Sequence, residues 1–191
     1  MNWMAVIPLK GSEERKTRLG SRLGMQGRQR LSEELFEHVV SVLRQVPTLR
    51  DVALLSDVRP TQWRGPFFLD QGRGLNAELN AQVESHRPSG LLVIHADLPL
   101  VSVDDIAALI TGNGAGSAIA PDRHGVGTNA LALVEPSGFD FAFGPNSFTR
   151  HCAAARGARV VTRLGLGLDI DTAADLDAAI AAGFTSAWTD S

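Results

Sequence analysis

The strongest constraint on the fold is a regular alternation of two kinds of segment along the chain. Short apolar runs rich in branched residues alternate with longer segments in which apolar residues recur at helical spacing. The predicted strands are residues 4–8, 52–56, 67–70, 91–96, 116–121, 129–134 and 159–162. The predicted helices are residues 27–45, 75–85, 103–110, 147–155 and 172–182. This βαβ order predicts an α/β fold in which a mostly parallel sheet has helices on both faces.

Two of the predicted helices carry a recognisable start signal. Ser102 precedes Asp104 and Asp105, and either Asp171 or Thr172 stands before the last helix. A short side chain with an oxygen atom stabilises a helix start, because it accepts hydrogen bonds from backbone N–H groups that have no partner within the helix. We therefore expect helices to begin at both places.

Composition predicts a folded protein of one domain over residues 1–191. The chain has 191 residues, enough for one substantial core, and 44 % of them are hydrophobic while 20 % are charged. The formal net charge of −3 predicts no general basic surface. Nucleic acid is therefore not an expected partner.

The sequence shows no membrane or export signal. No apolar run approaches the roughly 20 residues that span a bilayer, so no membrane association is expected. The first residues, MNWMAVIPL, have neither a basic leader nor a small-residue cleavage site, which favours a cytoplasmic protein. The single cysteine, Cys152, cannot form an internal disulfide or a cysteine metal cluster.

Polar residues lie in four places beyond the predicted strands. The first strand leads into Lys10 and a loop to Gly24, the fourth into residues 95–99 and the fifth into residues 121–129. The fourth place is residues 168–172, before the last helix. Because ligands of such sheets bind beyond the carboxyl ends of the strands, we expect the functional residues in these segments.

Asp97 comes directly after an apolar strand and just before Pro99. A carboxylate at the tip of a strand can hold a hard cation such as Mg²⁺, which prefers oxygen ligands and bridges to substrate phosphates. The alternative is an aspartate that caps the helix near Ser102 or satisfies a turn. Taken alone, Asp97 leaves both interpretations open.

Asp169 and Asp171 flank Ile170. In an extended chain both carboxylates point to one side while Ile170 enters the core. Because paired acids repel unless a cation or a basic group lies near them, this spacing indicates metal binding. Asp171 is also a candidate N-cap for the last helix, and one residue can serve both purposes.

Two glycine-containing loops are candidate anion sites. Residues 125–129 form a turn from which backbone N–H groups and the Thr128 hydroxyl can reach an anion. Residues 143–147 place Gly144 before Asn146 and Ser147 at a helix start, where backbone donors and the helix dipole favour a phosphate or a carboxylate. Ordinary hairpin turns and helix caps use similar residues, so neither loop is specific alone.

The loop after the first strand holds both lysines of the chain, Lys10 and Lys16, beside Arg15, Arg18 and Arg22. All other basic residues of the chain are arginines. Lysine is a mobile point charge and arginine a planar fork, so the two are not equivalent choices. The presence of lysine only in this loop therefore favours the interpretation that the loop contacts a triphosphate. The alternative is a solvated loop whose positive charges are balanced by nearby acidic residues.

Several common enzyme motifs are absent. The chain has no G-x-S-x-G, no G-x-x-x-x-G-K-[ST] and no complete G-x-G-x-x-G after the first strand. The sequence therefore gives little support to a nucleophilic hydrolase or an ordinary dinucleotide-dependent dehydrogenase. His151 and Cys152 are neighbours in a predicted helix, and adjacent helical residues do not face one another, so no catalytic dyad is expected.

Taken in order, a set of short motifs resembles the guanylyltransferase family of deazaflavin coenzyme F-420 biosynthesis, within the superfamily that also holds molybdenum-cofactor guanylyltransferases. The motifs are P-L-K (8–10), K-T-R-L (16–19), G-L-N (74–76), A-D-L-P (96–99), A-P-D-R (120–123), G-T-N-A-L (127–131), F-G-x-x-S-F (143–148), His151 and D-I-D-T (169–172). The resemblance covers nearly the whole chain. The G-T-N-A-L and F-G-x-x-S-F blocks separate it from related nucleotidyltransferases.

The resemblance implies a Rossmann-like, three-layer nucleotidyltransferase fold of the GT-A type. It also implies transfer of GMP from GTP to phosphoenolpyruvate, 2-phospho-L-lactate or 3-phospho-D-glycerate, with release of pyrophosphate and with Mg²⁺ as cofactor. The implied metal ligands are Asp97, Asp169 and Asp171, and the implied acceptor-binding residues are Thr128, Gly144 and Ser147. The implied nucleotide-binding residues are Lys10, Lys16, Arg18, Gly74 and Asn76, with Lys16 and Asp97 as catalytic residues.

Three alternatives stay open at the level of sequence. One is another nucleotidyltransferase that uses CTP, or a sugar-phosphate or pterin acceptor. A second is a glycosyltransferase of the same general fold, in which D-x-D is a familiar metal site. A third is a nucleotide-binding protein without catalysis. The sequence does not choose among the three phosphorylated acids, and a homodimer is possible but not specified.

Overall fold

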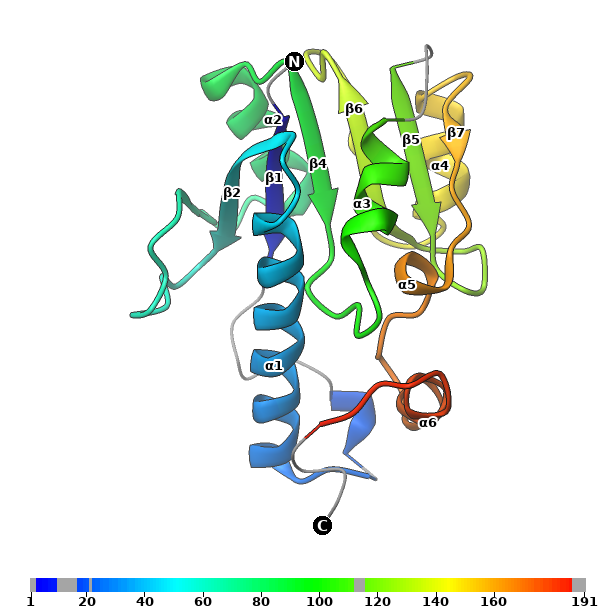
Figure 1. Cartoon of the computed structure of the whole chain (residues 1–191). Coiled ribbons are helices and arrows are strands. Elements are labelled where there is room, and N and C mark those ends of the chain that lie inside the picture. Colours follow the sequence, from blue (N-terminus) through cyan, green and yellow to red (C-terminus); the bar gives the residue numbers. More distant parts are fainter. Residues whose placement is uncertain (1–2, 10–16, 21, 112–115, 187–191) are drawn as a thin grey trace.

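A seven-stranded mixed sheet forms the centre of the computed structural model, which describes residues 3–9, 17–20, 22–111 and 116–186 (Figure 1). The strands are β1 (Trp3–Pro8), β2 (Leu49–Ser56), β3 (Phe67–Leu69), β4 (Gly90–Ile94), β5 (Ser117–Pro121), β6 (Thr128–Val134) and β7 (Arg159–Val160). The helices are η2 (Thr17–Leu19), α1 (Met25–Arg44), α2 (Leu75–His86), α3 (Val103–Ile110), α4 (Ser147–Ala154), α5 (Leu164–Gly167) and α6 (Ala173–Ala181).

The order of strands in the sheet is β3-β2-β1-β4-β6-β5-β7. β6 runs antiparallel to both of its neighbours, β4 and β5, and the other four strand pairs are parallel. The carboxyl ends of β1, β4 and β5 therefore meet the amino end of β6 at one edge of the sheet, which we call the carboxyl edge. The expectation of a mostly parallel sheet is confirmed.

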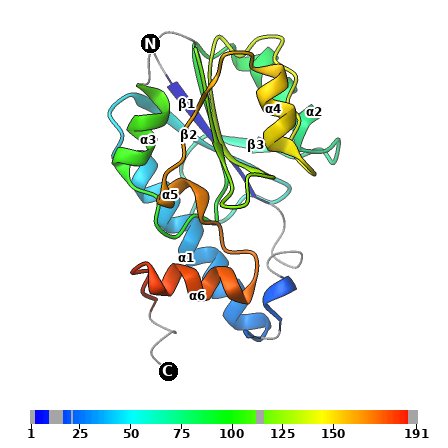
Figure 2. The same cartoon turned by 90° about the vertical axis from the view of Figure 1, so that its right-hand side faces the viewer.

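Helices cover both faces of the sheet. Figure 2 shows α2 and α4 on one side and α1, α3 and α5 on the other. Side chains alternate between the two faces along each strand. In β1, Ala5 and Ile7 join the cluster on the α1 side, while Met4 and Val6 join the cluster on the α2 side.

A third apolar cluster lies beyond the carboxyl edge and holds α6 against the first half of α1 (Figures 1 and 2). Leu31 and Leu35 of α1 pack there with Leu176 of α6. Ile170 is fully buried in the same cluster, as its place between two aspartates predicts. This packing fixes the segment that carries Asp169 and Asp171.

The sequence locates every strand of the described chain, with ends that differ from the observed ones by at most three residues. It misses η2 and α5, which are short and have no helical period of their own. Ser102 caps α3 as expected, but Thr172 caps α6, so the alternative of an Asp171 cap is wrong. Among the helices of the described chain, none combines the length and hydropathy that a bilayer span requires.

Glu78 ties the loop before α2 to the body of the fold. Its carboxylate is fully buried and accepts hydrogen bonds from the backbone N–H groups of Gln71 and Arg73, at 2.9 and 3.2 Å. The Arg73 guanidinium adds two further contacts, at 3.1 and 2.7 Å. The hydrogen bond from the Arg73 side chain, which outweighs the effect of burial, lowers the pKa of Glu78 from its ordinary 4.5 to about 2.

This carboxylate should make the fold sensitive to acid. Between pH 4.5 and about 2 the unfolded chain binds a proton that folded Glu78 does not bind, so its contribution to stability is lost as the pH falls. We expect Glu78→Gln to lower the free energy of unfolding at pH 6 and to weaken its pH dependence between pH 6 and 3. Urea titrations measure both quantities, with Glu84→Gln, an exposed position of the same helix, as the control. An unchanged acid dependence in Glu78→Gln would contradict this account.

Candidate active site

Three aspartates converge at the carboxyl edge. Asp97, Asp169 and Asp171 each place a carboxylate oxygen within 4.8 Å of the other two. Asp97 and Asp169 are half-buried and Asp171 is exposed. The site thus offers three hard oxygen ligands on one side of a solvent-accessible edge, a donor set that suits Mg²⁺.

The backbone brings these acids together by pairing two segments far apart in sequence. Asp97 lies three residues beyond the end of β4. The N–H of Ile170 donates to the carbonyl oxygen of Asp97 at 3.1 Å, which holds residues 169–171 alongside the strand tip. With Ile170 anchored in the core, Asp169 and Asp171 face the same side as Asp97.

Burial and the charges of the cluster together raise the pKa of one of the three acids. Burial raises the pKa of the Asp169 carboxyl, and the negative charge of Asp97 raises it further. Two carboxylates at such separations repel by roughly 3 kcal/mol near a protein surface. A bound divalent cation would remove this repulsion, which is the electrostatic reason to regard the cluster as a cation site.

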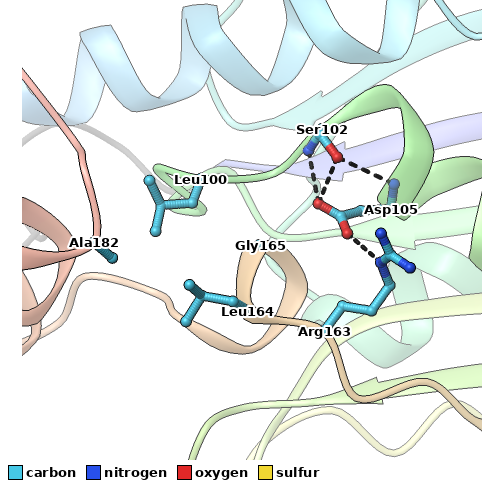
Figure 3. Close-up of a pocket in the computed structure, with 7 residues that line it drawn as sticks. All are labelled: Leu100, Ser102, Asp105, Arg163, Leu164, Gly165 and Ala182. Atoms are coloured by element: carbon cyan, nitrogen blue, oxygen red, sulfur yellow. Dashed lines mark hydrogen bonds and ion pairs between the residues drawn. The ribbon is translucent and has the colours of Figure 1, made fainter.

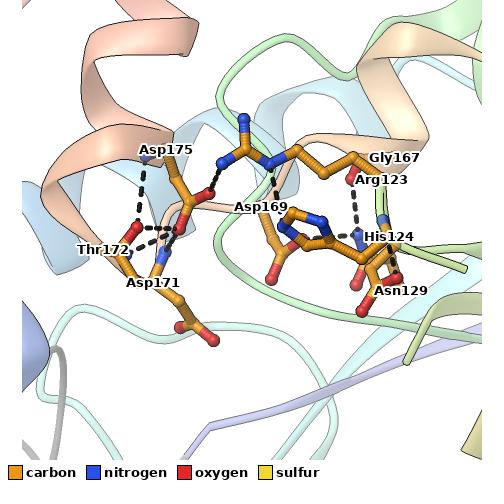
Figure 4. A network of polar contacts seen from close by, with 9 residues as sticks. Arg123, His124, Asn129, Gly167, Asp169, Asp171, Thr172 and Asp175 are labelled. Carbon is orange, nitrogen blue, oxygen red and sulfur yellow. Dashed lines mark hydrogen bonds and ion pairs between the residues drawn. The ribbon is translucent and has the colours of Figure 1, made fainter. Parts of the chain in front are cut away.

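Asn129 holds Asp169 in place (Figure 4). Its side-chain amide is buried and donates to Asp169 Oδ1 at 3.0 Å and to the carbonyl oxygen of Leu166 at 3.0 Å. The hydrogen bond from Asn129 acts against the rise in the pKa of Asp169. Asn129 therefore favours the ionised carboxylate that a cation needs.

A network of hydrogen bonds and an ion pair around Asp175 holds the backbone at Asp171 (Figure 4). Asp175 accepts hydrogen bonds from the N–H groups of Asp171 and Thr172, at 3.1 and 2.7 Å, and pairs with the guanidinium of Arg123. Arg123 belongs to the loop between β5 and β6. The N-terminus of α6, which presents Asp171, is thus tied directly to the carboxyl edge.

A shift of register at the start of β6 places the side chains of Thr128 and Asn129 on the faces opposite to those that regular alternation predicts. Ala120 of β5 pairs with Ala130, but Pro121 pairs with Thr128, so Asn129 is an extra residue in the strand. Regular alternation from Ala130 would turn Thr128 toward the α1 side. Instead Thr128 contacts α4, while Asn129 contacts the segment around α5. Such bulges are frequent beside active sites, where they redirect side chains.

The turn at residues 122–127 uses its own backbone donors. Asp122 accepts from the N–H groups of His124, Val126 and Gly127, at distances of 3.0, 2.9 and 2.8 Å. The expectation that backbone N–H groups of residues 125–129 are open to an anion is therefore wrong for Gly127, and also for Gly125, which donates to the carbonyl oxygen of Asp122 at 3.0 Å. The hydroxyl of Thr128 remains the predicted donor of this turn, on a side chain that is only 1 % exposed.

The second candidate anion loop lies against the first. The N–H of Phe148 donates to the carbonyl oxygen of Val126 at 3.1 Å, which joins the start of α4 to the β5–β6 turn. In this loop Gly144 and Asn146 both have positive φ, 116° and 55°. Non-glycine residues rarely adopt such angles, and they concentrate at functional sites. The structure thereby gathers Thr128, Gly144 and Ser147 around one place.

Asn76 lies at the start of α2 and forms hydrogen bonds with the loop at residues 143–147. Its amide accepts from the N–H of Phe143 at 2.8 Å and donates to the carbonyl oxygen of Phe143 at 3.1 Å. Gly74, the N-cap of α2, has a φ of 89° that favours glycine. A nucleotide contact for Gly74 and Asn76 stays a prediction, but Asn76 also has a structural role that the sequence does not indicate.

The basic loop after β1 lies largely outside the described residues, and this holds for both Lys10 and Lys16. Arg18, in η2, is exposed. Arg22 pairs with Asp177 of α6 at 2.9 Å, with both side chains more than half exposed. The roles of Lys10, Lys16 and Arg18 in nucleotide binding stay predictions.

A separate pocket of about 500 Å³ contains none of the three clustered acids (Figure 3). Its polar side chains satisfy one another, because Asp105 accepts from the N–H and the hydroxyl of Ser102 at 3.0 and 2.7 Å and pairs with Arg163. The contacts between Ser102 and Asp105 are the capping contacts of α3. The candidate active site is therefore the carboxyl edge rather than this pocket.

Comparison with known proteins points to one family. Residues 3–187 match the sequence model of the family described as guanylyl transferase CofC like. A phosphoenolpyruvate guanylyltransferase of Sphaerobacter thermophilus is 38% identical over 93% of this chain and 92% of its own length. One from Rubrobacter xylanophilus is 37% identical, over 92% of each chain. A nucleotidyl transferase structure from Methanothermobacter thermautotroptrophicus, 15% identical, aligns with a TM-score of 0.65 over 95% of this chain and 99% of its own, which supports the predicted nucleotidyltransferase fold.

Removing the amide of Asn129 should weaken cation binding at the candidate site. In Asn129→Leu, Asp169 loses a hydrogen bond that favours its ionised form. Loss of a partner that orients a metal ligand typically costs 10- to 100-fold in affinity, and we expect about tenfold weaker binding of Mn²⁺. Titration of Mn²⁺ followed by electron paramagnetic resonance measures it.

The matched control is Asn80→Leu, at a half-buried position of α2 away from the acids. Thermal unfolding of both variants checks that they fold. Unchanged Mn²⁺ affinity in a folded Asn129→Leu variant would show that Asn129 does not support the cation site.

Proposed function

We propose that this chain, which belongs to the guanylyl transferase CofC-like family, transfers GMP from GTP to a small phosphorylated carboxylic acid and releases pyrophosphate. The first acceptor to consider is phosphoenolpyruvate, because the relatives that share more than a third of their residues with this chain carry that acceptor in their names. Related acceptors are 2-phospho-L-lactate and 3-phospho-D-glycerate. The product would serve the biosynthesis of coenzyme F-420.

The observation that carries the proposal is the cluster of Asp97, Asp169 and Asp171 beside two contacting loops at one edge of the sheet. The acids would hold Mg²⁺, which when bound neutralises charge on the phosphates of GTP. The loops would hold the acceptor through Thr128, Gly144 and Ser147. Both reactants would therefore meet at the carboxyl edge.

The reaction needs alignment more than acid–base chemistry. An oxygen of the acceptor phosphate forms a bond to the α-phosphorus of GTP, and the bond from that phosphorus to the oxygen bridging to the β-phosphorus breaks. Pyrophosphate leaves with that electron pair. Because the acceptor phosphate is already ionised at neutral pH, no general base is required, and positioning with charge neutralisation supplies the catalysis.

The nucleotide would lie between the basic loop and the start of α2. We assign contacts with the triphosphate to Lys10, Lys16 and Arg18, with Lys16 as the catalytic cation. Gly74 and Asn76 would contact the base or the ribose. The side chain of Asn76 already hydrogen-bonds the backbone of Phe143. In this arrangement Asn76 would contact both the nucleotide and the loop at residues 143–147, which would hold the acceptor.

Incubation of the protein with GTP, Mg²⁺ and each of the three acids in turn tests the proposal. We expect a guanylylated acid and one equivalent of pyrophosphate, identified by mass spectrometry and a coupled phosphate assay. Product with CTP, or sugar release from a nucleotide sugar, would support one of the other enzyme classes. No product from any of the three acids would refute the proposed substrate class.

Asp97→Asn should abolish turnover and leave the fold intact. Loss of a metal ligand removes several kcal/mol of charge stabilisation, so we expect kcat to fall roughly a thousandfold. Without a cation the variant should be at least as stable as the parent, because it relieves repulsion within the cluster. The control is Asp104→Asn, at an exposed position of α3. An unfolded variant, or one with full activity, would count against the assignment.

A further inference from the structure

His151 lies directly behind the proposed acceptor site and has no role in the chemistry described above. It belongs to α4 and is fully buried. Its Nδ1 lies 2.9 Å from Oγ1 of Thr128, and its Nε2 accepts from the N–H of Ala142 at 3.0 Å. The ring of Phe143 packs edge-on against it, with the ring centres 4.7 Å apart.

These contacts define the tautomer of the imidazole. The backbone N–H of Ala142 can only donate, so Nε2 must be the unprotonated nitrogen. Burial, and to a smaller extent the electrostatic interactions with Arg150 and His95, lowers the pKa of His151 to about 4, so the ring is neutral at pH 7. In a neutral ring with a bare Nε2, the hydrogen is on Nδ1 and points at Thr128.

The direction of this hydrogen bond determines what Thr128 can do. A threonine hydroxyl has one hydrogen to donate and lone pairs to accept with. Because Thr128 accepts from His151, its hydrogen is left for a different partner. No other side-chain hydrogen bond of Thr128 is present within the described part of the chain.

We propose that His151 is a positioning residue that fixes the Thr128 hydroxyl as a hydrogen-bond donor to the anionic acceptor. Both the phosphate and the carboxylate of such an acid accept hydrogen bonds only, so a hydroxyl locked as a donor suits them. The inference rests on the proposed function, since it needs the acceptor to bind at Thr128. His151 also holds Ala142, two residues before Gly144, and thereby joins both loops of the acceptor site.

The tautomer can be tested without catalysis. Nitrogen-15 NMR of histidine-labelled protein at pH 7 should show His151 with a protonated Nδ1 and an unprotonated Nε2. The resonance is assigned by its loss in His151→Gln. A protonated Nε2 or a doubly protonated ring would overturn the inference.

Two variants separate the two contacts of the ring. In His151→Gln the amide oxygen can reach the N–H of Ala142 but no donor faces Thr128, whereas in His151→Asn the amide nitrogen takes the place of Nδ1. We expect the KM for the acid to rise roughly tenfold in His151→Gln and by less in His151→Asn. The KM for GTP and kcat should change little in both, and His86→Gln, an exposed histidine of α2, should behave as the parent. An equal rise in both variants would show a merely structural role and overturn the inference.

A double variant checks that the effect passes through Thr128. Thr128→Val keeps the shape of the side chain but removes its hydroxyl, so adding His151→Gln should cause no further rise in KM. Independent effects that multiply would refute the proposed link. If the parent protein guanylylates none of the acids, the proposed function fails; if it does so and these variants behave otherwise, only the role of His151 fails.

Discussion

The bulge at the start of β6 is the feature on which the two halves of the site depend. One extra residue, Asn129, turns Thr128 toward α4 and lets the Asn129 amide reach Asp169. The proposed acceptor contact and the support of the proposed metal ligand are therefore consecutive residues on one strand. Their separation is set by the backbone, which is stiff, rather than by packing between elements. For a reaction that relies on alignment, this arrangement restricts the error in placing one reactant against the other.

The antiparallel direction of β6 gives this bulge its position. A parallel strand between β4 and β5 would have its carboxyl end at the edge where Asp97 lies. Because β6 runs the other way, its first residues lie there, directly beside the strand tip. Residues just beyond the ends of β4 and β5 and those opening β6 thus share one edge. Two kinds of contact keep the three acids together there. The third apolar cluster buries Ile170, and Asn129 and the Arg123–Asp175 pair make polar contacts with the residues on either side of it.

The sequence could predict the strands, the capped helices and the three acids, since each has a local signal. Apolar period, capping residues and the D-x-D spacing are all read within a few positions of the chain. The roles of Asn129 and His151 could not be predicted in this way. Both depend on a shift of strand register and on contacts with residues 23 to 40 positions away. The hydrogen bonds from Val126 and Gly127 to Asp122 show the opposite case, in which a turn that reads as an open anion site closes on its own aspartate.

Burial without charge distinguishes His151 from the acid cluster. A carboxylate cluster tolerates its charge because it opens to solvent and to a cation, as the exposed Asp171 illustrates. A fully buried imidazole reaches neither solvent nor a cation, so its neutral form is the stable one. The single N–H hydrogen of that neutral ring must then be on one particular nitrogen. The N–H of Ala142 donates a hydrogen bond to Nε2, so the hydrogen of the ring must be on Nδ1. A loop that would surround the acceptor therefore also sets the direction of the hydrogen bond beneath it, and the loop and Thr128 should respond together when the acceptor binds.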